Sequence, residues 1–228
     1  MAVDPQQVIA EQAGKLVQDN MLIGLGTGRA ATAFIHALGE RVKHGLKVKG
    51  VPTSERSDEL ARQLGIPLTT LAEVSELDLN FDGADEVDPN GQLIKGLGGA
   101  LVREKIVAAT ARRFIVLVGS EKKVKKLGER GTLPVEVVPF GLPLCQRRLQ
   151  AMGLKPVPRQ KDAKLFISDN GNPILDCQIK GIDDPHALER ELLKVPGVVD
   201  TGLFLDMADT VLIGHDDGRV ETWKRGEK

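Results

Sequence analysis

Two apolar patterns alternate along the first half of the chain. Short apolar-rich runs predict buried strands, and longer stretches with apolar positions three and four apart predict helices. The predicted strands are residues 21–25, 46–51, 67–71, 77–81 and 114–118, and the predicted helices are residues 5–19, 29–43, 55–65 and 100–111. Strands that alternate with helices in this way imply right-handed crossovers and a mostly parallel sheet, which is an α/β fold.

The pattern changes near Gly131. From there the chain predicts a strand, a helix, two strands around a turn, a helix and a strand, at residues 134–138, 141–152, either side of 169–172, 184–195 and 198–204. This β-α-β-β-α-β order is the ferredoxin-like unit, so we expect a second, smaller α+β domain at residues 131–206. A hairpin over residues 210–223 is expected to return to the first domain, which would comprise residues 1–130 and 207–228.

The amino-acid composition limits the classes of molecule that the chain is expected to bind. The chain has 228 residues, 41% of them hydrophobic, and a formal net charge of −1. With 3% aromatic residues and no tyrosine, it offers neither the electrostatic field nor the stacking surface for nucleic acid or an anionic membrane. No uncharged apolar run approaches the ~18–20 residues that span a bilayer. The N-terminus lacks a basic region followed by an apolar run, and the isolated Cys145 and Cys177 are expected to be reduced thiols, so we expect a cytoplasmic location.

A glycine-rich turn, Gly24–Gly28, separates the first predicted strand from the helix at 29–43. Glycines there let the backbone approach an anion, and the helix N-terminus presents free N–H groups to it. The third glycine of a dinucleotide fingerprint is replaced by Arg29, and no acidic residue ends the second strand. The turn therefore favours a phosphate or hydroxyl-bearing ligand over a nicotinamide dinucleotide, and a turn without a ligand stays open. Thr53 and Ser54, at the next strand-to-helix junction, are equally consistent with a helix cap and with a binding role.

An acidic segment follows the strand at 77–81. Its carboxylates are Asp82, Asp85, Glu86 and Asp88. Their spacing fails the pattern of a calcium loop, which needs oxygens at alternate positions and a glycine at the sixth. A magnesium site and a solvated acidic turn both stay open.

Three further charged residues are candidates for chemistry. Lys95 lies in a glycine-rich loop, where it could stabilise an oxyanion or form a surface ion pair. Glu104 is flanked at four-residue spacing by two alanines, which leaves space beside a candidate base, although an exposed glutamate is the commoner case. Lys122 opens a run of lysines that is either a solvated helix face or the source of one lysine for a ligand crevice.

Together these groups suit a sugar phosphate bound across the carboxyl ends of the strands. A carboxylate could remove a proton from a carbon next to a carbonyl, and a lysine could stabilise the enediolate oxygen. Such a set serves an aldose–ketose isomerisation and requires no redox cofactor. A sugar-phosphate-sensing module without catalysis would share the same phosphate-binding features, and it is the alternative function.

In combination the motifs resemble type A ribose-5-phosphate isomerase over nearly the whole chain. The residues that carry the resemblance are Gly24–Gly28, Asp82–Glu86, Lys95–Ala100, Arg103–Lys105, Ser120 with Lys122, and Pro134–Val137. The resemblance implies interconversion of D-ribose 5-phosphate and D-ribulose 5-phosphate in the non-oxidative pentose phosphate pathway. It also implies a Rossmann-like main domain, a ferredoxin-like lid or oligomerisation domain, no metal or other cofactor, and a homodimer or homotetramer.

The resemblance also implies roles for individual residues. Glu104 falls on the family's general base, Asp82 and Asp85 on the aspartates of ring opening and hydroxyl proton transfer, and Lys95 on the lysine near the oxyanion. The implied substrate-binding residues are Gly26, Thr27, Gly28, Arg29, Ala30, Asp82, Gly83, Ala84, Asp85, Lys95, Gly96, Leu97, Gly98 and Lys122.

The chain departs from the family pattern at a few positions. Arg29 replaces a common serine, Gly119 replaces a common aspartate, and Gln6 and Gln7 lie where some members have a lysine. We expect these departures to affect substrate affinity more than the type of reaction.

Overall fold

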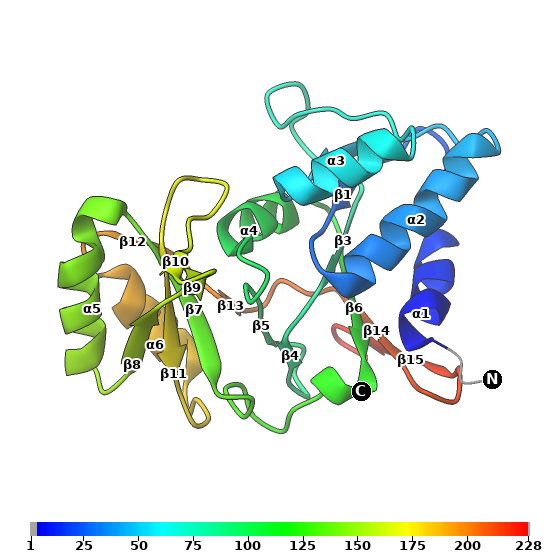
Figure 1. Cartoon of the computed structure of the whole chain (residues 1–228). Coiled ribbons are helices and arrows are strands. Elements are labelled where there is room, and N and C mark those ends of the chain that lie inside the picture. Colours follow the sequence, from blue (N-terminus) through cyan, green and yellow to red (C-terminus); the bar gives the residue numbers. More distant parts are fainter. Residues whose placement is uncertain (1–3, 228) are drawn as a thin grey trace. The chain divides into compact units, whose positions relative to one another are not determined.

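The computed structural model describes residues 4–227, so Met1–Val3 and Lys228 lie outside the described residues. Met1–Val3 belong to the N-terminal segment in which the sequence shows no basic region followed by an apolar run. The chain forms two compact units (Figure 1). Unit 1 comprises residues 1–84, 103–122 and 207–228, and unit 2 comprises residues 85–102 and 123–206. These ranges differ from the expected domains, because residues 85–102 and 123–130 group with unit 2.

Unit 1 is built around a mostly parallel sheet. Its strands are β1 (Leu22–Leu25), β2 (Lys49–Pro52), β3 (Leu79–Gly83), β6 (Phe114–Gly119), β14 (Thr210–Gly214) and β15 (Val220–Lys224), and its helices are α1 (Pro5–Gly14), α2 (Arg29–Lys43), α3 (Glu55–Gln63), most of α4 (Leu101–Thr110) and the short η1 (Ser120–Lys122). The sheet order is β15-β14-β6-β3-β1-β2. All neighbouring strands are parallel except the β14–β15 pair, which confirms the predicted C-terminal hairpin and the Rossmann-like α/β fold.

Helices cover both faces of this sheet. Alternate residues of the strands, among them Ile23 and Phe81, join one apolar cluster with α1, α2 and α3. The opposite face packs against α4, whose Val107 joins a cluster with Val51 and Leu77. Figure 1 shows α1 and α2 on one side of β3 and β6, and α4 on the other. Because side chains alternate between the faces of a strand, β1 contributes to both clusters, with Ile23 and Leu25 on one face and Leu22 on the other.

The helix predicted at 5–19 ends earlier, at Gly14. It begins as expected, because the Asp4 carboxylate accepts a hydrogen bond from the Gln6 N–H and Pro5 occupies the first helical position. At the other end, the Arg41 guanidinium of α2 donates hydrogen bonds to the carbonyls of Gly14 and Val17. Carbonyls satisfied by a side chain need no further helical turn, so the buried Val17 is reached through turns instead.

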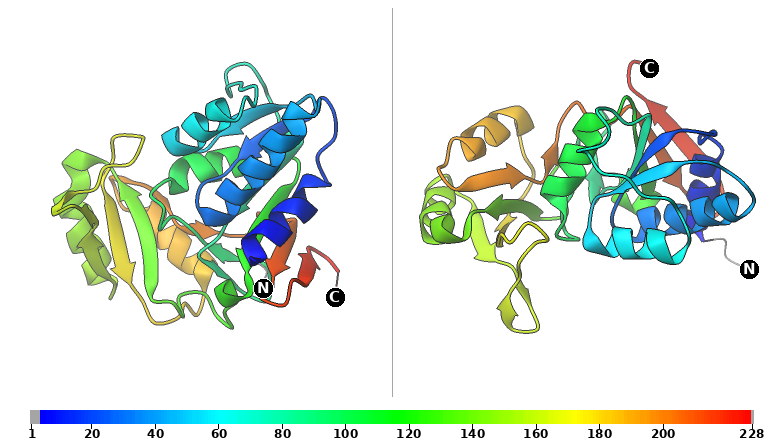
Figure 2. Two further views of the ribbon diagram at one scale, coloured as in Figure 1. Left: turned by 45° about the vertical axis from the view of Figure 1, so that its right-hand side comes forward. Right: turned by 90° about the horizontal axis from the view of Figure 1, so that it is seen from above.

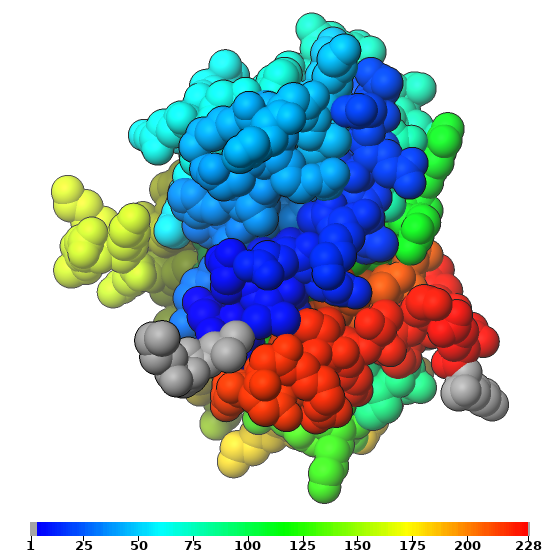
Figure 3. Space-filling view, turned by 90° about the vertical axis from the view of Figure 1, so that its right-hand side faces the viewer, coloured from blue at the N-terminus to red at the C-terminus, as the bar shows by residue number. Residues whose placement is uncertain are grey.

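The C-terminal hairpin lies beside the first helix, although the two segments are at opposite ends of the chain. Figure 3 shows this surface of unit 1, with the hairpin in red next to α1 in blue. Gly214 of β14 makes the approach possible, because a Cβ there would lie 2.7 Å from the Pro5 carbonyl oxygen. The sheet of unit 1 is therefore completed by the last strands of the chain.

Unit 2 contains the predicted ferredoxin-like arrangement. Its elements are β7 (Thr132–Val137), η2 (Pro139–Gly141), α5 (Leu142–Ala151), β8 (Lys155–Pro158), β11 (Ile174–Gln178), α6 (Pro185–Leu193) and β12 (Val198–Thr201). The sheet order is β12-β7-β11-β8, and all neighbours are antiparallel. Both α5 and α6 cover the same face of this sheet through one apolar cluster that includes Leu149 and Leu192 (Figure 2).

Three details of unit 2 and its surroundings differ from the prediction. The run at 198–204 is interrupted, because β13 (Leu203–Phe204) leaves the ferredoxin-like sheet and pairs with β5 (Leu93–Ile94), which in turn pairs with β4 (Glu86–Val87). An additional hairpin, β9 (Gln160–Lys161) and β10 (Lys164–Leu165), lies between β8 and β11. The run at 67–71 in unit 1 is not a strand and makes only an isolated bridge from Leu68 to Gly50. Two-residue strands and isolated bridges carry too few alternating positions to be predicted from periodicity.

Candidate active site

The carboxyl ends of β1 and β3 form the part of unit 1 where a ligand is expected. From β1 the chain proceeds outward to β2 and then returns to β3 on the other side, so the strand order reverses between β1 and β3. Open α/β sheets bind ligands in the crevice outside the carboxyl ends of the strands at such a point. The glycine-rich turn follows β1 and Asp82 lies near the end of β3, so both belong to this edge.

Asp82 is completely buried and is held by backbone N–H groups. One of its carboxylate oxygens, Oδ1, accepts hydrogen bonds from the N–H groups of Thr27 (3.0 Å) and Gly83 (2.8 Å). Gly26 makes this approach possible, because a Cβ at position 26 would lie 2.3 Å from that same oxygen. Since the Gly26 N–H also donates to the Phe81 carbonyl (2.9 Å), the turn after β1 is fixed directly against the end of β3.

The hydroxyl of Thr27 belongs to a cluster of hydroxyl groups. Its Oγ1 lies 2.8 Å from both Thr53 Oγ1 and Ser54 Oγ, and Ser57 Oγ donates to the Gly26 carbonyl (2.6 Å). Ser54 Oγ also accepts from the Ser57 N–H, which makes it the N-cap of α3. The helix-cap interpretation of Ser54 is therefore confirmed, and the cluster joins the turns after β1 and β2.

The N-terminus of α2 lies beside a cleft. Gly28, the N-cap of α2, has a φ of 103° and supplies no side chain to the first-turn N–H groups. A cleft of about 670 Å³ beside this terminus is lined by residues that include Gln6, Gln7, Arg29 and Arg56. Three of the positions that depart from the family pattern thus share one cleft.

The fourth departure lies beside the same cleft. Glu121, which also lines it, comes within 3.9 Å of the exposed Arg29 guanidinium. A Cβ on Gly119 would lie 2.0 Å from the Glu121 carboxylate, so the glycine leaves the space that this carboxylate occupies. Both partners are largely exposed, so the ion pair itself contributes little stability.

Glu104 is buried, with 4% of its surface exposed, rather than an ordinary exposed glutamate. It lies in the first turn of α4, between the buried Ala100 and Ala108. Since α4 leads into the parallel strand β6, its N-terminus lies at the carboxyl edge of the sheet. The helix packs closely there, because a Cβ on Gly24 would lie 2.7 Å from Val107 Cγ1.

Unit 2 carries Lys95 and Asp85. The side chain of Lys95 is buried, with 2% exposure, and its Nζ lies 5.3 Å from the centroid of the Phe204 ring, at cation–π distance. The backbone N–H of Lys95 donates to the Gly202 carbonyl (2.8 Å). Gly202, just before β13, therefore fixes the backbone of this lysine, and Phe204 of β13 contacts its ammonium group. The half-buried Asp85 accepts a hydrogen bond on Oδ2 from the N–H of Leu97 (3.0 Å). A surface ion pair is therefore excluded for Lys95.

The acidic segment does not form a metal cluster. Glu86 is buried and accepts hydrogen bonds from the N–H groups of Gly128 (2.5 Å) and Arg130 (2.8 Å), while Asp88 accepts from those of Asn90 and Gln92. Burial raises the pKa of the Glu86 carboxyl above its usual value, and the two N–H groups oppose this effect. Within residues 4–227, no group of three or more histidine, cysteine or acidic side chains is placed to hold a metal ion.

The lysine run is not a helix face. Only η1 is helical there, and the half-buried Lys122 is its last residue. Lys123 and Lys125 are exposed, and Lys126 pairs with Asp183. Lys122 therefore differs from its neighbours in burial, which is consistent with a separate role.

Each unit thus holds part of the predicted site. Unit 1 carries Gly26–Ala30, Asp82–Ala84, Glu104 and Lys122, and unit 2 carries Asp85 and Lys95–Gly98. Phe204 was not predicted, and it lies more than a hundred positions from Lys95. Its contact arises from the pairing of β13 with β5, for which the sequence gives no periodic signal.

The chain is similar to known proteins over most of its length. The family model of ribose 5-phosphate isomerase A (phosphoriboisomerase A) matches residues 49–218. Ribose-5-phosphate isomerase A of Roseiflexus sp. (strain RS-1) is 53% identical over 219 residues, covering 95% of this chain and 94% of that protein.

Solved structures of isomerases are similar over nearly the whole chain. Ribose 5-phosphate isomerase A from Methanocaldococcus jannaschii has a TM-score of 0.92 at 47% identity and covers 97% of this chain and 98% of its own. A D-ribose-5-phosphate isomerase in complex with phospho-erythronic acid has a TM-score of 0.94 at 41% identity and covers 99% and 100%. In sequence and in fold, this chain therefore belongs to the ribose 5-phosphate isomerase A family.

Proposed function

We propose that this chain interconverts D-ribose 5-phosphate and D-ribulose 5-phosphate by a metal-free enediolate proton transfer, as part of the non-oxidative pentose phosphate pathway. Family membership supports the reaction and favours it over a sugar-phosphate-sensing module. The observation that carries the proposal is the burial of the Glu104 carboxylate at the carboxyl edge of the sheet. A carboxylate removed from water at a ligand-binding edge is suited to act as a base.

Each catalytic residue has a role in this proposal. Glu104 removes the proton from C2 of the open-chain aldose, and the negative charge develops on the oxygen at C1. The ammonium group of Lys95 stabilises that oxygen. A proton then moves from the C2 hydroxyl to the C1 oxygen, and Glu104 returns its proton to C1, which leaves a ketone at C2. Asp82 and Asp85 assist ring opening and the transfer between hydroxyl groups.

The substrate phosphate is proposed to bind at the N-terminus of α2. The first-turn N–H groups there receive no side-chain cap, and helix N-termini bind anions through such groups and the helix dipole. The isomerase solved with phospho-erythronic acid shows that a protein of this fold accommodates a phosphorylated ligand. We assign the remaining contacts to Gly26–Ala30, Gly83, Ala84, Gly96–Gly98 and Lys122.

The Glu104→Gln variant tests the base. We expect kcat to fall by about a thousandfold, because general-base catalysis is typically worth 10²–10⁴-fold. Substrate binding, measured by calorimetry, should be retained because the amide has nearly the same shape. Glu40→Gln, at an exposed position near the end of α2, is the matched control and should keep full activity. Near-normal turnover in Glu104→Gln would remove Glu104 from the role of base.

Exchange in heavy water distinguishes catalysis from sensing. The isomerase should incorporate deuterium at C1 or C2 of the sugar, as detected by NMR, and the Glu104→Gln variant should not. Binding of ribose 5-phosphate without exchange by the natural chain would favour the sensing module. Activity should also persist after treatment with a chelator, and its loss would contradict the metal-free mechanism.

Location and assembly are proposals as well. Among residues 4–227 the structure contains no helix with the length and apolar character needed to cross a membrane. We propose a cytoplasmic homodimer or homotetramer that has no nucleic acid or membrane partner, with the ferredoxin-like part of unit 2 as the lid or oligomerisation domain. Light scattering coupled to gel filtration measures the assembly, and a monomer at micromolar concentration would contradict it.

A further inference from the structure

The loop that follows Lys95 has few side chains of its own to hold it. Gly96 and Gly99 have φ values of 105° and 89°, in the left-handed region that favours glycine. Leu97, between them, is 49% exposed. A segment so rich in glycine has high conformational freedom in the unfolded chain, so its native path must be fixed by contacts from elsewhere.

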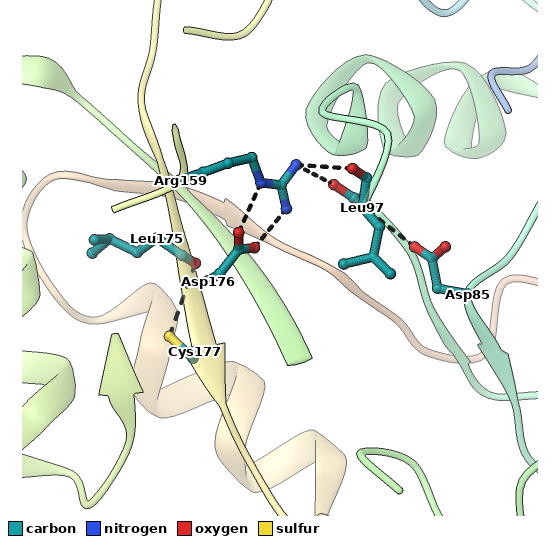
Figure 4. A network of polar contacts seen from close by, with 7 residues as sticks. Asp85, Leu97, Arg159, Leu175, Asp176 and Cys177 are labelled. Carbon is teal, nitrogen blue, oxygen red and sulfur yellow. Dashed lines mark hydrogen bonds and ion pairs between the residues drawn. The ribbon is translucent and has the colours of Figure 1, made fainter. Parts of the chain in front are cut away.

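Arg159 supplies these contacts from the residue after β8. One of its guanidinium nitrogens, Nη1, donates to the carbonyl oxygens of Gly96 (2.9 Å) and Leu97 (3.2 Å). The other two nitrogens form a bidentate pair with Asp176 of β11, at 2.9 Å and 2.6 Å. Figure 4 shows Arg159 between Asp176 and the backbone of Leu97. Its side chain is only 11% exposed, so these charge-assisted bonds lie largely out of water.

Two further residues fix the same loop. The centroid of the Phe166 ring lies 5.7 Å from the Arg159 guanidinium carbon. The ring also fills the space at Gly99, where a Cβ would lie 2.4 Å from Phe166 Cζ. On the other side, Asp85 accepts the hydrogen bond from the Leu97 N–H. The peptide groups of Leu97 are thus held at both the carbonyl and the N–H, within one residue of Gly96 and two of Lys95.

We infer that Arg159 is a positioning residue for the reaction. Its guanidinium takes its own orientation from Asp176 and transmits it to the backbone after Lys95, so that the Lys95 ammonium and the Gly98 N–H group face the substrate in a fixed geometry. Arg159 itself does not touch the substrate. The inference rests on the proposed function for the assignment of Lys95–Gly98 to the site, and it goes beyond that function by adding a residue from the ferredoxin-like sheet.

Only an arginine can make this set of contacts. The planar fork places two N–H groups on a carboxylate and leaves another nitrogen for the carbonyls, whereas a lysine ammonium acts as a point charge on a flexible stem. Arg159→Lys therefore keeps the charge beside Asp176 but releases the loop. A misplacement of about 1 Å in a catalytic group can cost 10²-fold in rate.

The test compares Arg159→Lys with Arg62→Lys. Arg62 also forms a bidentate pair, with Asp58 in α3, but the pair is exposed and does not contact the loop. We expect Arg159→Lys to lower kcat/KM by about 10–100-fold, following the sensitivity of rate to geometry, and Arg62→Lys to leave it unchanged. Amide hydrogen exchange should rise in the peptide over residues 95–101 and stay constant over β7.

Chemical rescue provides a second readout. Added guanidinium ion, at a concentration that leaves the natural chain folded, should raise the activity of Arg159→Ala severalfold and should not affect Arg159→Lys. Normal kcat/KM in Arg159→Lys would overturn the inference. Lost activity with unchanged exchange in residues 95–101 would also overturn it, because Arg159 would then act by a route other than the loop. A chain that no longer folds would overturn it as well, because Arg159 would then be a stability residue. Absence of isomerase activity in the natural chain would instead refute the proposed function, and loop exchange would still test Arg159.

Discussion

The carboxylate of Asp82 depends on a residue that has no side chain. Gly26 lies so close to Asp82 that any Cβ would overlap its Oδ1, and the same Cβ would lie 2.5 Å from the Phe81 carbonyl oxygen. Backbone atoms cannot yield as a flexible side chain does. The glycine is therefore required by its neighbours, and not by its own φ angle.

Gly26→Ala should displace Asp82 from the N–H groups of Thr27 and Gly83. We expect kcat/KM to fall by at least about 100-fold, because catalytic geometry tolerates little displacement. Gly50→Ala is the matched control, since its Cβ would lie 2.5 Å from Leu25 Cδ1, away from Asp82. It should lose about 1–3 kcal/mol of stability through overpacking and keep most of its activity per folded molecule. Equal activity losses in the two variants would contradict a specific role for Gly26.

The buried thiol of Cys177 makes the stability of the folded chain change with pH in the alkaline range. The thiol is completely buried, and burial raises its pKa to about 12. An unfolded cysteine ionises near pH 8.5, so the protonated thiol is favoured in the folded state. Its contribution to stability is complete below about pH 8.5 and declines as pH rises towards 12, by at most about 1.4 kcal/mol per pH unit.

Urea unfolding at pH 8, 9 and 10 measures this decline. The sequence contains no tyrosine, so thiols and lysines are the side chains that titrate there. Cys177→Ala should lose stability less steeply with pH than the natural chain, whatever its absolute stability. Parallel slopes in the two proteins would show that the thiol ionises equally in the folded and unfolded states.

At the scale of elements, contacts distant in sequence decide where the helices and strands end. The predicted bounds of α2, α5 and α6 agree with the structure to within about two residues, because their apolar positions and end signals lie in the same local segment. The end of α1 was missed because it is set by Arg41, on another helix. The small sheet of β4, β5 and β13 was missed because β13 and β5, which pair in it, are distant in sequence.

The candidate site shows the same division. The turn after β1 and the acidic segment could be proposed from the sequence, because strand ends and glycines mark them locally, and Glu104 could be proposed from its two flanking alanines. The burial of Lys95 against Phe204 and the contact of Arg159 with Gly96 could not be found, since no spacing links those positions. A lone buried ion partner has no local sequence signal, whereas a turn or a cap does.

Arg41→Ala tests the control of the end of α1. We expect a loss of about 1.5–3 kcal/mol, because two backbone carbonyls lose a charged donor. Chemical denaturation measures the loss, and hydrogen exchange should increase at residues 15–18 more than in α2. Lys43→Ala, which removes only the exposed ion pair with Glu40, should change stability by less than about 1 kcal/mol. Similar losses in both variants would contradict the assigned role of Arg41.

At the scale of the whole molecule, the chain passes between the two units after Ala84, Val102, Lys122 and Asp206. Unit 1 is therefore assembled from three separate stretches of sequence. Its central strand β6 is buried along its whole length and lies between β3 and β14, and β14 comes from the last stretch. A chain that ends at Asp206 would leave one edge of β6 without a partner.

Such an edge is apolar and has no charged residue to oppose pairing with other chains. We expect the chain truncated after Asp206 to aggregate, as measured by gel filtration and light scattering. A chain ending at Arg225, which retains β14 and β15, should behave like the natural protein. A folded, non-aggregating truncated chain would show that β14 is dispensable for unit 1.

The late position of β14 also bears on how the protein is made. A ribosome completes β6 long before it reaches residue 210, and the ferredoxin-like segment emerges in between. Until β14 has been synthesised, the unpaired edge of β6 can pair with strands of other chains. Chaperones that shield apolar edges should therefore bind during this interval. Stop codons that end the chain before residue 210 would consequently cause misassembly rather than a mild loss of activity.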